Sequence, residues 1–216
     1  GLLLGTFTFR LNAIPLFYPF VAGFALIGPF AAIGLYELSR RREQGLETSW
    51  RHAFDVLRSP SRWAIAELGL LLLVVFGVWI ATAQAIYEAN FGLEPIAADE
   101  FVHRVMTTPE GWRLIIAGNL VGFLFAVMAF MLSSVSFPLL LDRQVGMPIA
   151  ILTSVRAFLR NPLTLALWGF FVGGTLAIAA LPFLVGLAVA VPVIGHATWH
   201  LYRKLVVPAH EVAAHE

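Results

Sequence analysis

The chain has 216 residues, of which 59% are hydrophobic and only 12% are charged, with a formal net charge of +1 and no cysteine. Soluble domains have about 25% charged residues, so this composition is typical of a membrane protein. The near-neutral charge offers no basic surface for nucleic acid. The lack of cysteine excludes disulfides, thiolate metal sites and a cysteine nucleophile.

Six apolar segments predict membrane-spanning helices, because about 20 apolar residues are needed to cross a bilayer core. In chain order they are residues 1–10, 15–39, 62–87, 110–137, 163–181 and 184–202, and we expect 1–10 to be the end of a longer segment. The last two form a hairpin, since Pro182 and Gly186 mark a short turn. The predicted fold is therefore all-α, a polytopic membrane bundle of about six helices, with one transmembrane domain at 1–207 and a short cytoplasmic tail at 208–216.

Three stretches between the spans are too polar to cross a membrane but carry an apolar helical face. They are residues 48–58, 98–106 and 148–160. In the first, Trp50, Phe54 and Leu57 share the apolar face. This pattern predicts short amphipathic helices that lie in the membrane interface.

Each amphipathic stretch ends at a polar residue followed by proline. The pairs are Ser59-Pro60, Thr108-Pro109 and Asn161-Pro162. Such pairs are typical of a helix start, because a polar cap binds a free amide and proline has no N–H to leave unbonded there. We therefore predict three interfacial helices that each turn directly into a span. We also predict an internal repeat of three units, each an interfacial helix followed by a helical hairpin, and we expect the first of these interfacial helices to lie outside the given sequence.

The basic residues indicate the orientation. Eleven of them, in 40–62, 143–160 and 203–204, fall on one side of the predicted topology, and Arg10, Arg104 and Arg113 fall on the other. Because Lys and Arg are enriched in cytoplasmic loops, both termini are predicted to be cytoplasmic.

This topology brings the ends of the second, fourth and sixth spans together at the cytoplasmic surface. Their polar residues are Tyr36, Glu37, Arg40, Asp142, Arg143, His196, His200 and Arg203. On a helix, the last three lie on one stripe. One interpretation is a site at which histidine carries a proton or binds a ligand beside Asp142 or Glu37.

The other interpretation is a packed lid, in which Arg203 pairs with a carboxylate while Trp199 and Tyr202 lie at the level of the lipid headgroups. It is favoured, because aromatic and basic residues are common at the ends of spans. A zinc site is disfavoured, since Ala197 stands where a His-Glu-x-x-His motif has its Glu. No catalytic, cofactor-binding or metal-binding residue is therefore predicted.

Glu67 and Asn119 are polar residues inside predicted spans. Glu67 either reaches the membrane surface or pairs with Arg62 or Arg160, because an isolated carboxylate in lipid is costly. Asn119 lies beside Gly118 and near Gly122. This pattern favours close helix packing with an interhelical hydrogen bond over an ion path.

Four motifs resemble a bacterial family of predicted integral membrane proteins of unknown function. They are "LIGPFAAIGLYELSRRREQG" (26–45), "TTPEGW" (107–112), "FPLLLDR" (137–143) and "PVIGHATWHLYRKLV" (192–206). The resemblance implies a bacterial inner-membrane protein but no activity. Members are sometimes labelled putative cytochrome oxidase subunits, although the two histidines here share one helix and a haem-copper centre needs several helices.

The sequence lacks enzyme templates such as a phosphate-binding glycine loop or a nucleophile elbow, which favours a non-enzymatic protein without a cofactor. The first hypothesis is an accessory, assembly or structural subunit that packs against other subunits of a larger membrane complex, respiratory or photosynthetic. The alternative is a small-solute or proton-coupled transporter with a polar gate at the cytoplasmic ends of the second, fourth and sixth spans. Under either hypothesis the protein lies in the lipid bilayer and does not bind nucleic acid.

Overall fold

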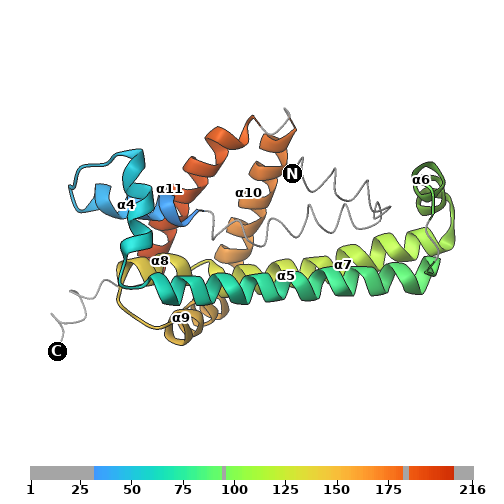
Figure 1. Cartoon of the computed structure of the whole chain (residues 1–216), viewed down its shortest axis with the longest axis horizontal. Helices are drawn as coiled ribbons and strands as arrows, with labels where there is room; N and C mark the ends of the chain where they lie inside the picture. The colour runs from blue at the N-terminus through green and yellow to red at the C-terminus, as the bar shows by residue number, and fades with distance from the viewer. Residues whose placement is uncertain (1–31, 94–95, 182–184, 207–216) are drawn as a thin grey trace. The chain divides into compact units, whose positions relative to one another are not determined.

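The structure is a computed structural model that describes residues 32–93, 96–181 and 185–206 (Figure 1). Within these residues the chain forms eight α-helices and one 3₁₀-helix, with no strand. This confirms the all-α prediction. The predicted span 1–10 and most of the span 15–39 lie outside the described residues.

The chain divides into two compact units. The first comprises residues 1–28 and 70–129, and the second comprises 29–69 and 130–216. The boundary passes through two long helices, α5 (Arg62–Phe91) and α7 (Pro109–Ser133).

In the first unit, α5 and α7 pack through Trp79. This side chain is buried, and its ring lies 5.6 Å from the ring of Phe125. A Cβ atom built at Gly122 would lie only 2.9 Å from the Trp79 ring, so glycine is required for this approach. The short helix α6 (Ala98–Thr107) contacts α5 through Phe101, whose ring lies 5.9 Å from that of Phe91.

In the second unit, six further helices surround a buried core. They are α4 (Ile33–Glu43), η2 (Trp50–Arg58), α8 (Ser136–Asp142), α9 (Met147–Arg160), α10 (Pro162–Ala180) and α11 (Leu187–Leu205). Helix α4 contacts η2, α8 and α11, and α9 contacts α8 and α10. Fully buried side chains such as Phe137, Leu165 and Trp199 fill the interior.

The three predicted amphipathic stretches are helical, as η2, α6 and α9. The first is a 3₁₀-helix, with a capping box between Ser49 and His52 at its start. Two junctions match the prediction, because α7 begins at Pro109 and α10 at Pro162. The third prediction is wrong: Pro60 lies in a turn and α5 begins only at Arg62, because the Ser59 carbonyl closes a turn with the Arg62 amide.

The predicted fourth span is broken near its end. Helix α7 stops at Ser133 and α8 begins at Ser136. The buried hydroxyl of Ser154 on α9 accepts from the Val135 amide (3.2 Å) and donates to the Met131 carbonyl (2.7 Å). A side chain inserted into the helical ladder in this way bends the helix, and the bend sets the direction of α8.

Three helical segments among the described residues are long and apolar enough to cross a membrane. They are α5, the segment Pro109–Asp142 that contains α7 and α8, and α10. Helix α11 occupies the predicted sixth span but is not among them. Its second half is polar, with His196, His200 and Arg203, so only its first half is continuously apolar.

Candidate functional site

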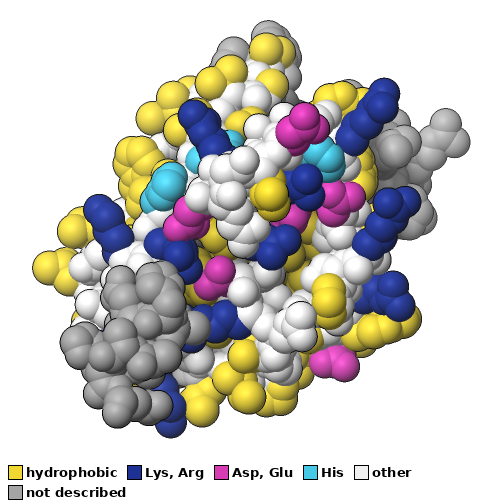
Figure 2. Space-filling model, turned by 90° about the vertical axis from the view of Figure 1, so that its left-hand side faces the viewer, with side chains coloured by type: hydrophobic (Ala, Val, Ile, Leu, Met, Phe, Trp, Pro, Cys, Tyr) yellow, Lys and Arg dark blue, Asp and Glu magenta, His cyan; other side chains and the backbone are white. Residues whose placement is uncertain are grey.

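The polar cluster lies in the second unit, where the ends of α4 and α8 meet α11. Figure 2 shows acidic, basic and histidine side chains gathered on this face of the molecule, with hydrophobic side chains toward its edges. The cluster joins residues that are far apart in the chain. Asp142 and Arg203 are 61 positions apart, and Glu43 and Arg203 are 160 positions apart.

Asp142, the last residue of α8, is held by two residues of α11. Its Oδ2 atom accepts a hydrogen bond from the Tyr202 hydroxyl at 2.6 Å and another from Arg203 Nη1 at 3.2 Å. Tyr202 is only 1% exposed. The structure thus brings Asp142 and Arg203 together, and Tyr202 joins them inside the protein instead of facing outward at the membrane surface.

Glu43 forms a second bridge from α4 to α11. Its carboxylate accepts from Trp199 Nε1 at 2.9 Å and from Arg203 Nε at 3.0 Å. Trp199 is completely buried. Glu43 is absent from the predicted cluster because the second span was expected to end at 39, whereas α4 continues to Glu43.

Glu37 and Arg40 pair with each other along α4. Arg40 Nε and Nη2 each donate to a different oxygen of the Glu37 carboxylate, both at 2.9 Å. This two-point hydrogen bond raises the pKa of Arg40 above its ordinary value. Glu37 is buried, and this arginine is the opposite charge with which it pairs.

The two histidines differ in their surroundings. The Ser39 hydroxyl donates to the Leu35 carbonyl at 2.8 Å, so its oxygen is left to accept from His196 Nδ1–H. His200 is exposed and makes no hydrogen bond or ion pair with the described residues. The remaining predicted member of α4, Tyr36, is buried.

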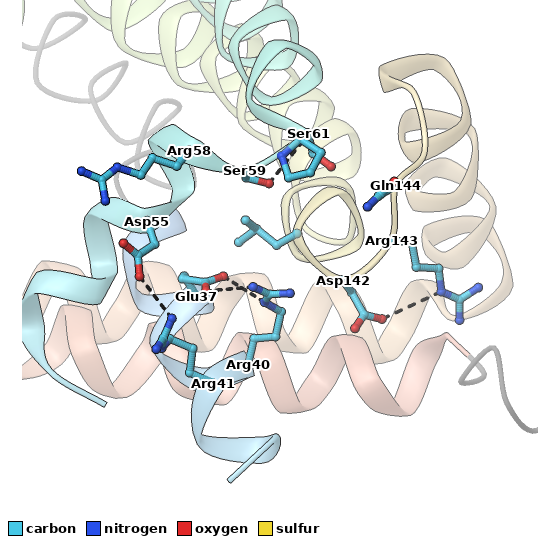
Figure 3. Close-up of a pocket in the computed structure, with 12 residues that line it drawn as sticks. Glu37, Arg40, Arg41, Asp55, Arg58, Ser59, Ser61, Asp142, Arg143 and Gln144 are labelled. Carbon is cyan, nitrogen blue, oxygen red and sulfur yellow. Dashed lines mark hydrogen bonds and ion pairs between the residues drawn. The ribbon is translucent and has the colours of Figure 1, made fainter. Parts of the chain in front are cut away.

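The other predicted residues contribute less to this network. Arg143 Nε forms an ion pair with Asp142 Oδ2 at 3.8 Å (Figure 3). Glu67 is exposed and forms no ion pair with the described residues, including Arg62 and Arg160. Asn119 is exposed and donates to the Ile115 carbonyl of its own helix at 2.8 Å.

A polar pocket of about 280 Å³ opens beside the cluster (Figure 3). It is lined by Glu37, Arg40, Arg41, Asp55, Arg58, Ser59, Pro60, Ser61, Leu141, Asp142, Arg143 and Gln144. Arg41 Nη1 donates to Asp55 at 3.1 Å, which ties α4 to η2. Within the described residues no group of three or more metal-ligating side chains is found.

A family model described as "Predicted integral membrane protein (DUF2189)" matches residues 17–142, more than half of the chain. The chain belongs to this family. This membership confirms the predicted family and the prediction of an integral membrane protein. The matched range contains most of the cluster on α4 and α8, whereas α11 and its motif at 192–206 lie beyond it.

No curated protein matches the chain. No solved structure matches it either.

Proposed function

We propose that this DUF2189 protein is a non-enzymatic accessory or assembly subunit that packs against other subunits of a larger complex in a bacterial inner membrane, with both termini in the cytoplasm. The observation that carries the proposal is the apolar side surface of its spans. In α10 and in the helix pair α7 and α8, only 6% of the most apolar window is buried within the protein.

The surface of α10 has the features of a helix-packing face. Phe170 and Ile178 are 70% and 69% exposed. Between them, no atom of the described residues lies within 4 Å of a Cβ built at Gly173 or Gly174. Since helices in lipid associate where small residues allow backbones to approach closely, this face suits a helix of a partner subunit.

The polar cluster supports the same proposal. Its carboxylates at Glu37, Glu43 and Asp142 accept from arginine, tyrosine and tryptophan side chains within the chain. A transport gate needs acid–base groups that are free to exchange partners. The cluster is therefore better suited to holding α4, α8 and α11 together as a lid.

The first experiment is purification of the tagged full-length protein from its native membrane in mild detergent, with mass spectrometry of the co-purifying proteins. We expect other membrane subunits in a fixed ratio. A monomer or homo-oligomer without partners would contradict the proposal, and transport assays would then be the next step.

A bulky substitution tests whether α10 is the contact face. Gly173→Leu fills the open surface and is expected to abolish co-purification without lowering thermal stability. Thr164→Leu is the control, because it adds an exposed side chain nine residues earlier, on the opposite side of the same helix. Equal retention of partners by both variants would exclude this face.

A further inference from the structure

The start of η2 is held by a hydrogen bond to a histidine. His52 Nδ1 accepts from the Ser49 backbone amide at 3.1 Å, and this bond is one half of the capping box that opens the helix. In a standard capping box the residue at this position is Glu or Gln. Because a backbone amide can only donate, Nδ1 carries no proton and the ring proton lies on Nε2. The bond therefore requires a neutral imidazole.

Protonation of His52 removes this acceptor. Among side chains, histidine is the one that ordinarily gains or loses a proton between about pH 5 and 8. A protonated imidazole has an N–H at both nitrogens, so Nδ1 can no longer accept from Ser49. The first turn of η2 also has no acidic residue and already carries Arg51, and a second positive charge is unfavourable at the positive end of a helix. Both effects weaken the same turn.

No ion pair fixes the charge of His52. Its side chain is partly exposed and pairs with no carboxylate of the described residues. Helix α4 packs against η2. The charged residues of η2, α4 and the adjoining chain are engaged elsewhere or exposed: Asp55 pairs with Arg41, Glu37 with Arg40 and Glu43 with Arg203, the charge of Arg42 acts on His196, Arg62 lies over the Trp63 ring, and Glu47, Arg51 and Arg58 are exposed. The charge of His52 thus follows the pH of the surrounding water.

The first turn of η2 depends on the capping box more than the rest of the helix does. Farther along, Asp55 accepts from Arg41 of α4 at 3.1 Å, and Val56 is buried. Trp50, by contrast, is 69% exposed, and its ring meets Phe54 of the same helix at 6.4 Å. The capping box therefore holds the turn that carries Trp50, the first residue of the apolar face of η2.

We propose that His52 makes the first turn of η2 sensitive to pH. Neutral His52 closes the capping box and holds the turn, whereas protonated His52 releases it while Asp55 and Val56 stay on α4. Acidification thus loosens the Trp50 end of an apolar face that we predict to lie in the membrane interface.

The experiment is amide hydrogen exchange of the purified full-length protein in neutral detergent, measured by mass spectrometry of its peptides. The two conditions are about pH 8 and about pH 5.5, between which histidine titrates while carboxylates ordinarily stay ionised. We expect the first turn of η2 to exchange about fivefold faster at the lower pH, relative to its intrinsic rate, the effect of losing a helix cap. His52→Gln keeps an acceptor that takes no proton, so it should be equally protected at both values, and His52→Ala should be poorly protected at both.

His103→Gln is the matched control, because His103 is an exposed histidine on another short amphipathic helix, α6. We expect this variant to show the pH response of the unmodified protein. The proposal is overturned if the unmodified protein protects η2 equally at the two pH values, if His52→Gln keeps the pH response, or if His52→Ala is as well protected as the unmodified protein at the higher pH. An equal loss of protection in α9 at the lower pH would show general unfolding instead of local release, and would also overturn it.

Discussion

Replacing Tyr202 with phenylalanine removes one hydroxyl group and leaves a buried ring in place. That hydroxyl donates to Asp142 at 2.6 Å, and the Asp142 side chain is only 17% exposed. A hydrogen bond to a charged group contributes about 1.5–3 kcal/mol. Because Arg203 still donates to the same carboxylate, we expect Tyr202→Phe to lower the free energy of unfolding by about 1.5–2 kcal/mol.

The assay is thermal unfolding of the purified protein in detergent. For a chain of this length about 1 kcal/mol shifts the melting temperature by about 2–4 °C, so the expected decrease is about 3–8 °C. Tyr87→Phe on α5 is the matched control. Tyr87 is also buried, but its hydroxyl makes no hydrogen bond with the described residues, so we expect almost no change.

A double-mutant cycle with Asp142→Asn tests whether Asp142 is the partner. If it is, the double variant loses less stability than the sum of the two single variants. The reasoning is refuted if Tyr202→Phe loses no more than Tyr87→Phe, or if its effect adds fully to that of Asp142→Asn.

Two further predictions use the same assay. Ser154→Ala removes a hydroxyl that bonds two backbone groups at the bend between α7 and α8, so it should cost about 2–4 kcal/mol. Thr153→Ala, at a partly exposed position on the same helix, should cost under about 0.5 kcal/mol. Equal effects would show that the bend does not depend on Ser154. Gly122→Ala places a methyl group 2.9 Å from the Trp79 ring and should cost about 1–3 kcal/mol, whereas Gly118→Ala meets no described atom within 4 Å and should cost nothing. A neutral Gly122→Ala would contradict the observed packing.

The sequence by itself determined the features that depend on neighbouring residues. Apolar length predicts the spans, as in α10, which was expected at 163–181 and is found at Pro162–Ala180. Local periodicity predicts the amphipathic helices at η2, α6 and α9. The prolines at 109 and 162 predict helix starts, because proline restricts only its own turn of the chain. The predicted ends of the second, fourth and sixth spans also include Asp142 and Arg203, which the structure brings together.

Only the tertiary structure decided which of these side chains are partners. Glu43 and Trp199 are 156 residues apart in the chain, and no periodicity relates them. Ser154 resembles any other serine of an amphipathic helix until its hydroxyl is seen between the Met131 carbonyl of α7 and the Val135 amide at the bend before α8. The reason is physical: a hydrogen bond between helices depends on where each backbone ends and bends, and these positions are set by packing of the whole unit, not by the residues adjacent in the chain.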